Sequence, residues 1–143
     1  VESAVSWKAA ITRADGPSCL VFSRQNLAHQ PRSAQQVADI ARGGYVLQDH
    51  ANAKVVLIAT GSEVELATKA ASALAAEGIC ARVVSMPCRE WFEAQSTGYQ
   101  DQVFPPSVRA RVSVEAAIAM GWRDIVGDAE GAGPLDIETS GTR

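Results

Sequence analysis

The polar residues Ser23, Arg24, Gln25 and Asn26 are of types that could bind a ligand. They directly follow the apolar run 18–22, which predicts a short buried strand. An arginine at the tip of such a strand can bind an anion, because its planar guanidinium presents a fork of donors that suits phosphate oxygens. Composition alone favours the other interpretation, a solvated arginine in a turn. Arg24 is therefore the candidate ligand-binding residue, while Gln25 and Asn26 are expected to fix the turn.

A second candidate is the strand-to-helix turn 60–63, TGSE, because a helix N-terminus at the edge of a sheet can bind anions. Ser62 and Glu65, however, have the S-x-x-E spacing of a capping box, which would occupy the free N–H groups of this helix. Glu63 would also repel an anion. The turn lacks the G-x-G-x-x-G pattern of a dinucleotide site. We therefore predict a structural cap here.

The histidines and cysteines form no catalytic or zinc-binding pattern. His29 and His50 lie among polar or small residues and are expected at the surface. Cys19 falls within the apolar run and is predicted to be core. Three irregularly spaced cysteines fit a reducing, cytoplasmic compartment. We predict no catalytic residue and no metal ligand in the chain.

Length and composition predict a globular protein of one ordinary domain's size: 143 residues, 47% hydrophobic and 20% charged. The net charge of −3 argues against binding to nucleic acid or to an anionic membrane. No apolar run approaches the roughly 20 residues that span a bilayer. The first residues do not form a signal peptide, and the absence of a starting Met favours a piece of a longer polypeptide.

Hydrophobic periodicity and turn residues predict alternating helices and strands. The expected helices are 2–13, 33–42 (with a Ser33–Gln36 capping box), 63–77 and two short segments within 91–104, the expected strands are 19–23, 45–47, 55–60, 81–86 and 109–114, and 115–126 is helix or loop. The strand–helix–strand unit from 55 to 86 predicts parallel pairing. The fold class is therefore α/β.

Six stretches, taken in order, resemble the C-terminal part of transketolases: VESAVSWKAAI, DGPSCLVFSRQNL, IARGGYVL, VVLIATGSEVELA, EGICARVVSMPC and RARVSVEAAIAMGW. The combination of SRQNL with IATGSEVELA is the specific part. The resemblance implies a three-layer αβα, Rossmann-like domain with a mostly parallel sheet and one antiparallel strand. It also implies three parts: the end of the pyrimidine-binding domain and a linker (1–30), the transketolase C-terminal domain (31–127) and a divergent tail (128–143).

Transketolases transfer a two-carbon ketol unit between sugar phosphates, using thiamine diphosphate and a divalent metal (Mg²⁺ or Ca²⁺), and act as homodimers in the cytoplasm. By resemblance, Arg24 takes the position that binds the substrate phosphate. The family's cofactor and metal residues have no counterpart in this sequence, so we expect none of these groups on the chain alone and no activity from it. Its expected role is to complete the subunit and support the dimer.

Three alternatives remain open at the level of sequence. The chain could be a free-standing α/β binding or regulatory module, or a subunit of a split thiamine-diphosphate enzyme. It could also belong to a relative such as a deoxyxylulose-phosphate synthase or a two-chain ketoacid dehydrogenase, although SRQNL favours transketolase. The tail after Gly127 departs from the family pattern. A truncated or frame-shifted gene would produce such a tail, and this is a hypothesis.

Overall fold

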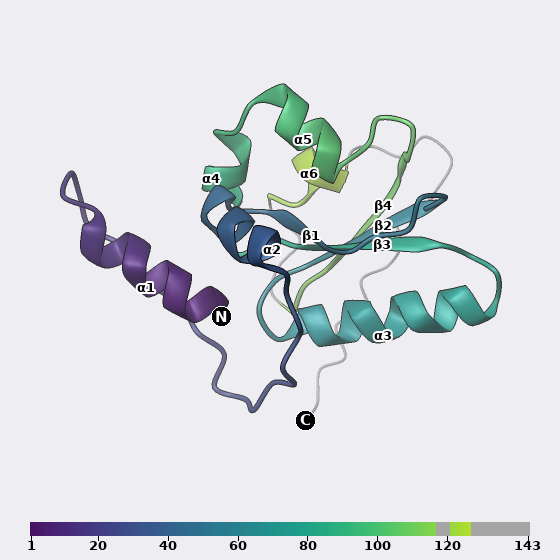
Figure 1. The fold of residues 1–143 in the computed structure, drawn as a ribbon, viewed down its shortest axis with the longest axis horizontal. Coiled ribbons are helices and arrows are strands. Elements are labelled where there is room, and N and C mark those ends of the chain that lie inside the picture. The colour runs from purple at the N-terminus through teal and green to yellow at the C-terminus, as the bar shows by residue number, and fades with distance from the viewer. Residues whose placement is uncertain (117–120, 127–143) are drawn as a thin grey trace.

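The computed structural model of the protein describes residues 1–116 and 121–126, and its elements follow the predicted alternation (Figure 1). In chain order they are α1 (Glu2–Thr12), α2 (Ala34–Asp39), the 3₁₀ helix η1 (Ile40–Arg42), β1 (Tyr45–Gln48), β2 (Val55–Ala59), α3 (Glu63–Ala76), β3 (Ala81–Ser85), α4 (Arg89–Glu93), α5 (Thr97–Val103), β4 (Ala110–Val114) and α6 (Arg123–Val126). No helix in the described part of the chain is long and apolar enough to cross a bilayer.

The described strands form one sheet in the order β1-β3-β2-β4. β2 pairs in parallel with both neighbours, so that Val55 lies opposite Ala81 on β3 and opposite Ala110 on β4. β1 pairs with β3 in the antiparallel sense, with an irregularity between Val46 and Gln48. The predicted sheet, mostly parallel with one antiparallel strand, is confirmed.

Helices cover both faces of the sheet, which gives the predicted three layers (Figure 1). Side chains alternate along β2: Leu57 and Ala59 pack in the core cluster beneath α3, whereas Val56 and Ile58 pack in the cluster beneath α4, α5 and α6. A strand with both faces buried reads as a continuous apolar run, which is why VVLIA was recognisable in the sequence.

The start and end of α2 and η1 follow local sequence signals. Ser33 has the extended backbone of a capping residue; its hydroxyl accepts a hydrogen bond from Gln36 N, and the Gln36 side chain accepts one from Ser33 N. Gly43, with φ of 88°, ends the 3₁₀ turn in the left-handed region that favours glycine. The predicted helix 33–42 and its capping box are confirmed.

The predicted strand 19–23 is wrong. These residues form no strand in the structure, and Val21 and Phe22 are 89% and 44% exposed. A strand needs a neighbour to bond its backbone groups, and none of the described strands pairs with this segment. Cys19 is consequently exposed rather than in the core.

Two further predictions, the divergent tail 128–143 and the helix or loop 115–126, concern residues outside the described part of the chain. The tail is outside it entirely. The segment 115–126 is outside it in part, and its last four residues form α6. The boundaries proposed at residues 30 and 127 stay predictions.

Candidate functional site

A cleft of about 910 Å³ lies at the carboxyl edge of the parallel strands. One wall consists of α1 and segment 17–23, and the other of residues 60–63, 86–91 and 115–116, which follow β2, β3 and β4. After β2 the chain turns to α3 on one face of the sheet, and after β3 it turns to α4 on the opposite face (Figure 1). Ligands of open α/β sheets bind at such a divergence of neighbouring strands. The cleft is therefore the candidate functional site.

Arg24 directly follows the lining segment 17–23 and has an exposed side chain. Its stretch of chain passes beside the start of α3, where Ala28 N lies 3.4 Å from Glu65 Oε2. Within the described residues Arg24 makes no hydrogen bond or ion pair. This geometry is compatible with an anion-binding arginine. The role of Arg24 stays a prediction.

The two arginines that line the cleft, Arg13 and Arg89, are already engaged. Arg13 bonds Asp15 Oδ1 through Nε at 2.9 Å and the Pro17 carbonyl through Nη1. Arg89 Nε lies 2.9 Å from Glu93 Oε1, and its Nη1 donates to the carbonyl of Gly121. Both side chains therefore serve local structure, and Arg24 differs from them in having no partner among residues 1–116 and 121–126.

The capping box predicted at Ser62 and Glu65 is wrong. Ser62 has helical backbone angles (φ −65°, ψ −30°), whereas a capping serine is extended. Its hydroxyl donates instead to Glu63 Oε1 at 2.8 Å. Glu65 forms an ion pair with Lys69 at 2.6 Å. The chain enters α3 through Gly61, whose φ of +54° leaves Ser62 already within the helical turn.

Both histidines are exposed, as predicted. His50 Nε2 lies 3.4 Å from Cys80 Sγ, near the amino end of β3. No three His, Cys, Asp or Glu side chains of the described residues are placed to hold a metal ion together. Neither histidine lines the cleft.

Cys88, in the wall of the cleft, is expected to react more slowly with iodoacetamide than an unhindered thiol at pH 8. Burial, and the Glu90 carboxylate 3.6 Å from its sulfur, raise the pKa of the Cys88 thiol. Less of the reactive thiolate is then present at pH 8, and the rate should continue to rise with pH beyond that value. Mass spectrometry of the three alkylated cysteine peptides over time measures this. Cys19, which is exposed, is the internal control, and equal rates for Cys19 and Cys88 in the folded protein would contradict the expectation.

Sequence reasoning missed Glu2, which contacts three parts of the domain. Its Oε1 accepts hydrogen bonds from Arg32, Tyr45 and Ser85. One signal was available: a tyrosine in a predicted buried strand needs a partner for its hydroxyl. The sequence could not say which residue that partner is.

The fold and the cleft define an open α/β domain whose candidate ligand site lies at the carboxyl edge of its parallel strands. A family model for the transketolase-like C-terminal domain matches residues 43–136. The chain therefore belongs to the transketolase family, as the six sequence stretches indicated.

Curated relatives and solved structures agree with this assignment. The chain is 60% identical over 128 residues to transketolase 2 of Vibrio vulnificus (strain CMCP6) and 57% identical over 128 residues to transketolase 1 of Vibrio cholerae; each alignment covers 89% of this chain and 19% of that protein. Its structure is similar to a transketolase from Leishmania mexicana (TM-score 0.79, 40% identity) and to a Pichia stipitis transketolase in complex with sedoheptulose-7-phosphate (TM-score 0.79, 37% identity). Each of these covers 85% of this chain and 18% of the other. The chain thus spans about a fifth of the length of these relatives.

Proposed function

We propose that this chain acts as the C-terminal portion of a transketolase, an enzyme that transfers a two-carbon ketol unit between sugar phosphates. The observation that carries the proposal is the 60% identity over 128 residues, which extends beyond the domain matched by the family model. In this proposal the chain completes a cytoplasmic, homodimeric enzyme. Arg24 contributes to the site that binds the substrate phosphate.

The described residues do not fit the thiamine diphosphate and divalent metal that the family uses. No metal-ligating group of three side chains is present among them, and the turn 60–62 is no glycine-rich phosphate loop, because it has one glycine and leads into Glu63, the first residue of α3. We therefore derive no chemical step through the cofactor on this chain. The contribution of the chain is binding and positioning.

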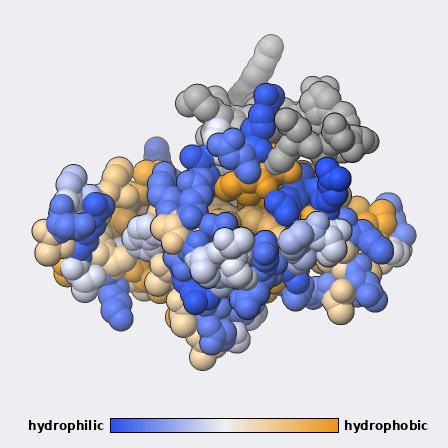
Figure 2. Space-filling model, turned by 90° about the horizontal axis from the view of Figure 1, so that it is seen from above, coloured by the Kyte–Doolittle hydropathy of each residue, from blue (hydrophilic) through white to orange (hydrophobic). Residues whose placement is uncertain are grey.

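Exposed apolar residues on α1 and the segment after it support the proposal that an upstream part of the enzyme packs against this chain. The exposed apolar residues are Trp7 and Ile11 of α1 (54% and 76% exposed) and Val21, Phe22 and Leu27 of the following segment, and the rings of Trp7 and Phe22 stack on one another. Apolar side chains reach the surface at the end of the molecule where α1 lies (Figure 2). Apolar groups gathered on one surface mark an interaction site. In this proposal the part of the polypeptide that precedes residue 1 in the relatives covers this surface.

The test is reconstitution of ketol transfer. We expect the purified chain alone to show no transfer between sugar phosphates, and a mixture with the upstream portion of the same enzyme to restore it. Phe22→Ser should weaken the reconstitution, because it removes an apolar ring from the proposed contact, whereas Leu66→Ser, on the exposed face of α3, should not. Activity of the chain alone, or equal effects of the two substitutions, would contradict the proposal.

A further inference from the structure

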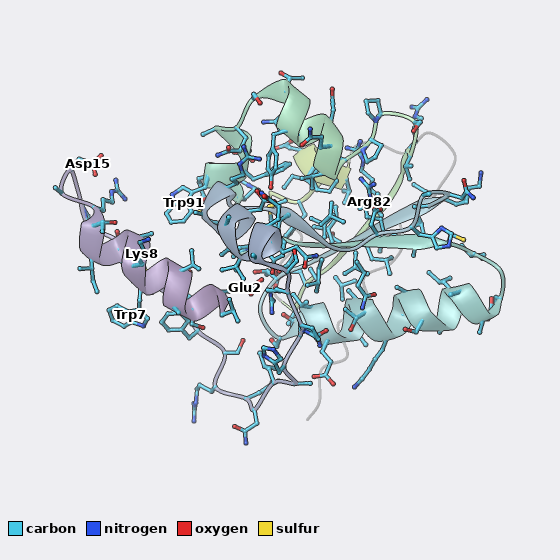
Figure 3. The ribbon with its side chains drawn as sticks, in the orientation of Figure 1. Glu2, Trp7, Lys8, Asp15, Arg82 and Trp91 are labelled. Atoms are coloured by element: carbon cyan, nitrogen blue, oxygen red, sulfur yellow. The ribbon has the colours of Figure 1, made fainter. Side chains whose placement is uncertain are left out.

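The carboxylate of Glu2 lies at the centre of a buried polar network (Figure 3). Its Oε1 accepts a hydrogen bond from the Tyr45 hydroxyl at 2.6 Å, from Ser85 Oγ at 2.6 Å and from Arg32 Nη2 at 3.1 Å. Arg32 also donates to the Tyr45 oxygen through Nε at 2.6 Å and to the Gln30 carbonyl through Nη1 at 2.7 Å. The network joins the first turn of α1 to the linker before α2, to β1 and to the end of β3.

Burial makes this network costly to break. The side chains of Glu2 and Arg32 are 20% and 8% exposed, and Tyr45 and Ser85 are 1% and 0% exposed. Burial, together with the Glu2 carboxylate, raises the pKa of the Tyr45 hydroxyl far above its usual range, so this hydroxyl stays a donor. Removing one partner of a buried pair leaves an uncompensated charge, which destabilises strongly. Such a network favours one position of α1 over others.

Apart from its packing along η1, helix α1 is held by few contacts. None of its residues is fully buried, and the half-buried Val5 packs against the core cluster beneath α3. Beyond its first turn the helix extends away from the sheet, and Glu2 lies at the end nearest the sheet (Figure 3). Glu2 therefore supplies the polar contacts of α1 with the sheet, beside the packing of the helix against η1.

The helix is in turn connected to the segment that carries Arg24. The ring of Trp7 stacks on the ring of Phe22, with centroids 6.3 Å apart and planes 28° apart. Phe22 precedes Arg24 by two positions. The contact of Ala28 N with Glu65 is a second connection of this segment to the domain, at 3.4 Å.

We propose that Glu2 is a positioning residue, which helps to fix α1 on the domain and, through the Trp7–Phe22 contact, sets the place of Arg24 beside the segment that lines the cleft. This inference rests on the proposed function only where it concerns the substrate phosphate. Because the Ala28 contact also holds the segment, the effect of losing Glu2 should be smaller than that of losing Arg24.

The test uses Glu2→Gln in the full-length enzyme that contains this chain. The amide keeps the shape of the side chain but loses its charge, which leaves Arg32 without a carboxylate. We expect the KM for a phosphorylated sugar to rise roughly tenfold with little change in kcat, less than the roughly hundredfold cost that a misplaced group can reach. The matched control is Glu77→Gln, a substitution of an exposed glutamate at the end of α3.

Two further measurements separate positioning from general stability. In the double variant Glu2→Gln/Arg24→Ala, KM should be no higher than in Arg24→Ala alone, because Glu2 acts through Arg24. Hydrogen exchange should show lost protection of the α1 amides and unchanged protection of β2. Should Glu2→Gln fail to fold, Ser85→Ala removes one donor and should produce the same changes on a smaller scale.

The outcomes are distinguishable. The proposal fails if Glu2→Gln matches Glu77→Gln in both α1 protection and KM, or if α1 loses protection while KM stays constant. Additive effects of Glu2 and Arg24 on KM would also overturn it. If the unmodified enzyme transfers no ketol unit, the proposed function fails instead, and α1 protection still tests whether Glu2 fixes the helix.

Discussion

Replacement of Arg24 by alanine in the full-length enzyme should raise the KM for phosphorylated sugars by about one to two orders of magnitude. A hydrogen bond to a charged group contributes roughly 1.5–3 kcal/mol, and about 1.4 kcal/mol corresponds to a tenfold change in affinity. Arg24 is exposed and has no partner within the described residues, so the substitution breaks no hydrogen bond or ion pair among them. Steady-state kinetics with phosphorylated and unphosphorylated sugars of equal length measure the effect.

Three comparisons make this result specific. The KM for the unphosphorylated sugar should not change, because it has no group for the guanidinium to bind. Arg24→Lys should recover only part of the affinity, since an ammonium retains the charge without the planar fork of donors. Arg109→Ala removes another exposed arginine that has no partner among the described residues and should have no effect. Equal KM values for Arg24→Ala and Arg109→Ala would show that Arg24 does not bind the phosphate.

Elements whose causes are local could be predicted from the sequence. The strand Val55–Ala59 is an apolar β-branched run, and the helix after it ends near Gly78, whose φ is +79°. The Ser33–Gln36 capping box formed because Ser33 is free to adopt an extended backbone after the linker. The parallel pairing of β2 with β3 also followed, because strands joined through a helix in one sheet run parallel. The strand, the helix end and the cap depend on neighbours within a few residues, and the pairing depends on one strand–helix–strand unit.

Features that depend on distant partners could not be predicted. The run 18–22 has the composition of a strand, but a strand requires a hydrogen-bonded neighbour, and none of the described strands supplies one. The Ser62–Glu65 pattern failed for a local reason that its spacing does not reveal: Gly61, with a positive φ, leads Ser62 into the helical turn.

The same distinction applies to the candidate site. The carboxyl edge of the sheet was a foreseeable place for a ligand, whereas the contribution of α1 and segment 17–23 to the cleft depends on tertiary contacts.

Glycine is required at position 43 for two separate reasons, and a comparison with Gly78 separates them. Both residues are in the left-handed region, with φ of 88° and 79°, where a side chain costs about 1–2 kcal/mol. At Gly78 an added Cβ meets nothing within 4 Å. At Gly43 it would lie 2.2 Å from the Cys88 carbonyl oxygen and 2.5 Å from Phe92 N. Backbone atoms of the turn that lines the cleft would therefore have to move.

We accordingly expect Gly78→Ala to lower the free energy of unfolding by about 1–2 kcal/mol, and Gly43→Ala to lower it by about 2–5 kcal/mol, because overpacking adds roughly 1–3 kcal/mol. Urea unfolding of the two variants and the unmodified chain provides the comparison. Gly43→Ala should also increase the reactivity of Cys88, since the clash displaces the carbonyl of that residue. If the two variants lose equal stability, the turn after β3 can move away without cost, and close packing of Gly43 against it does not stabilise the wall of the cleft.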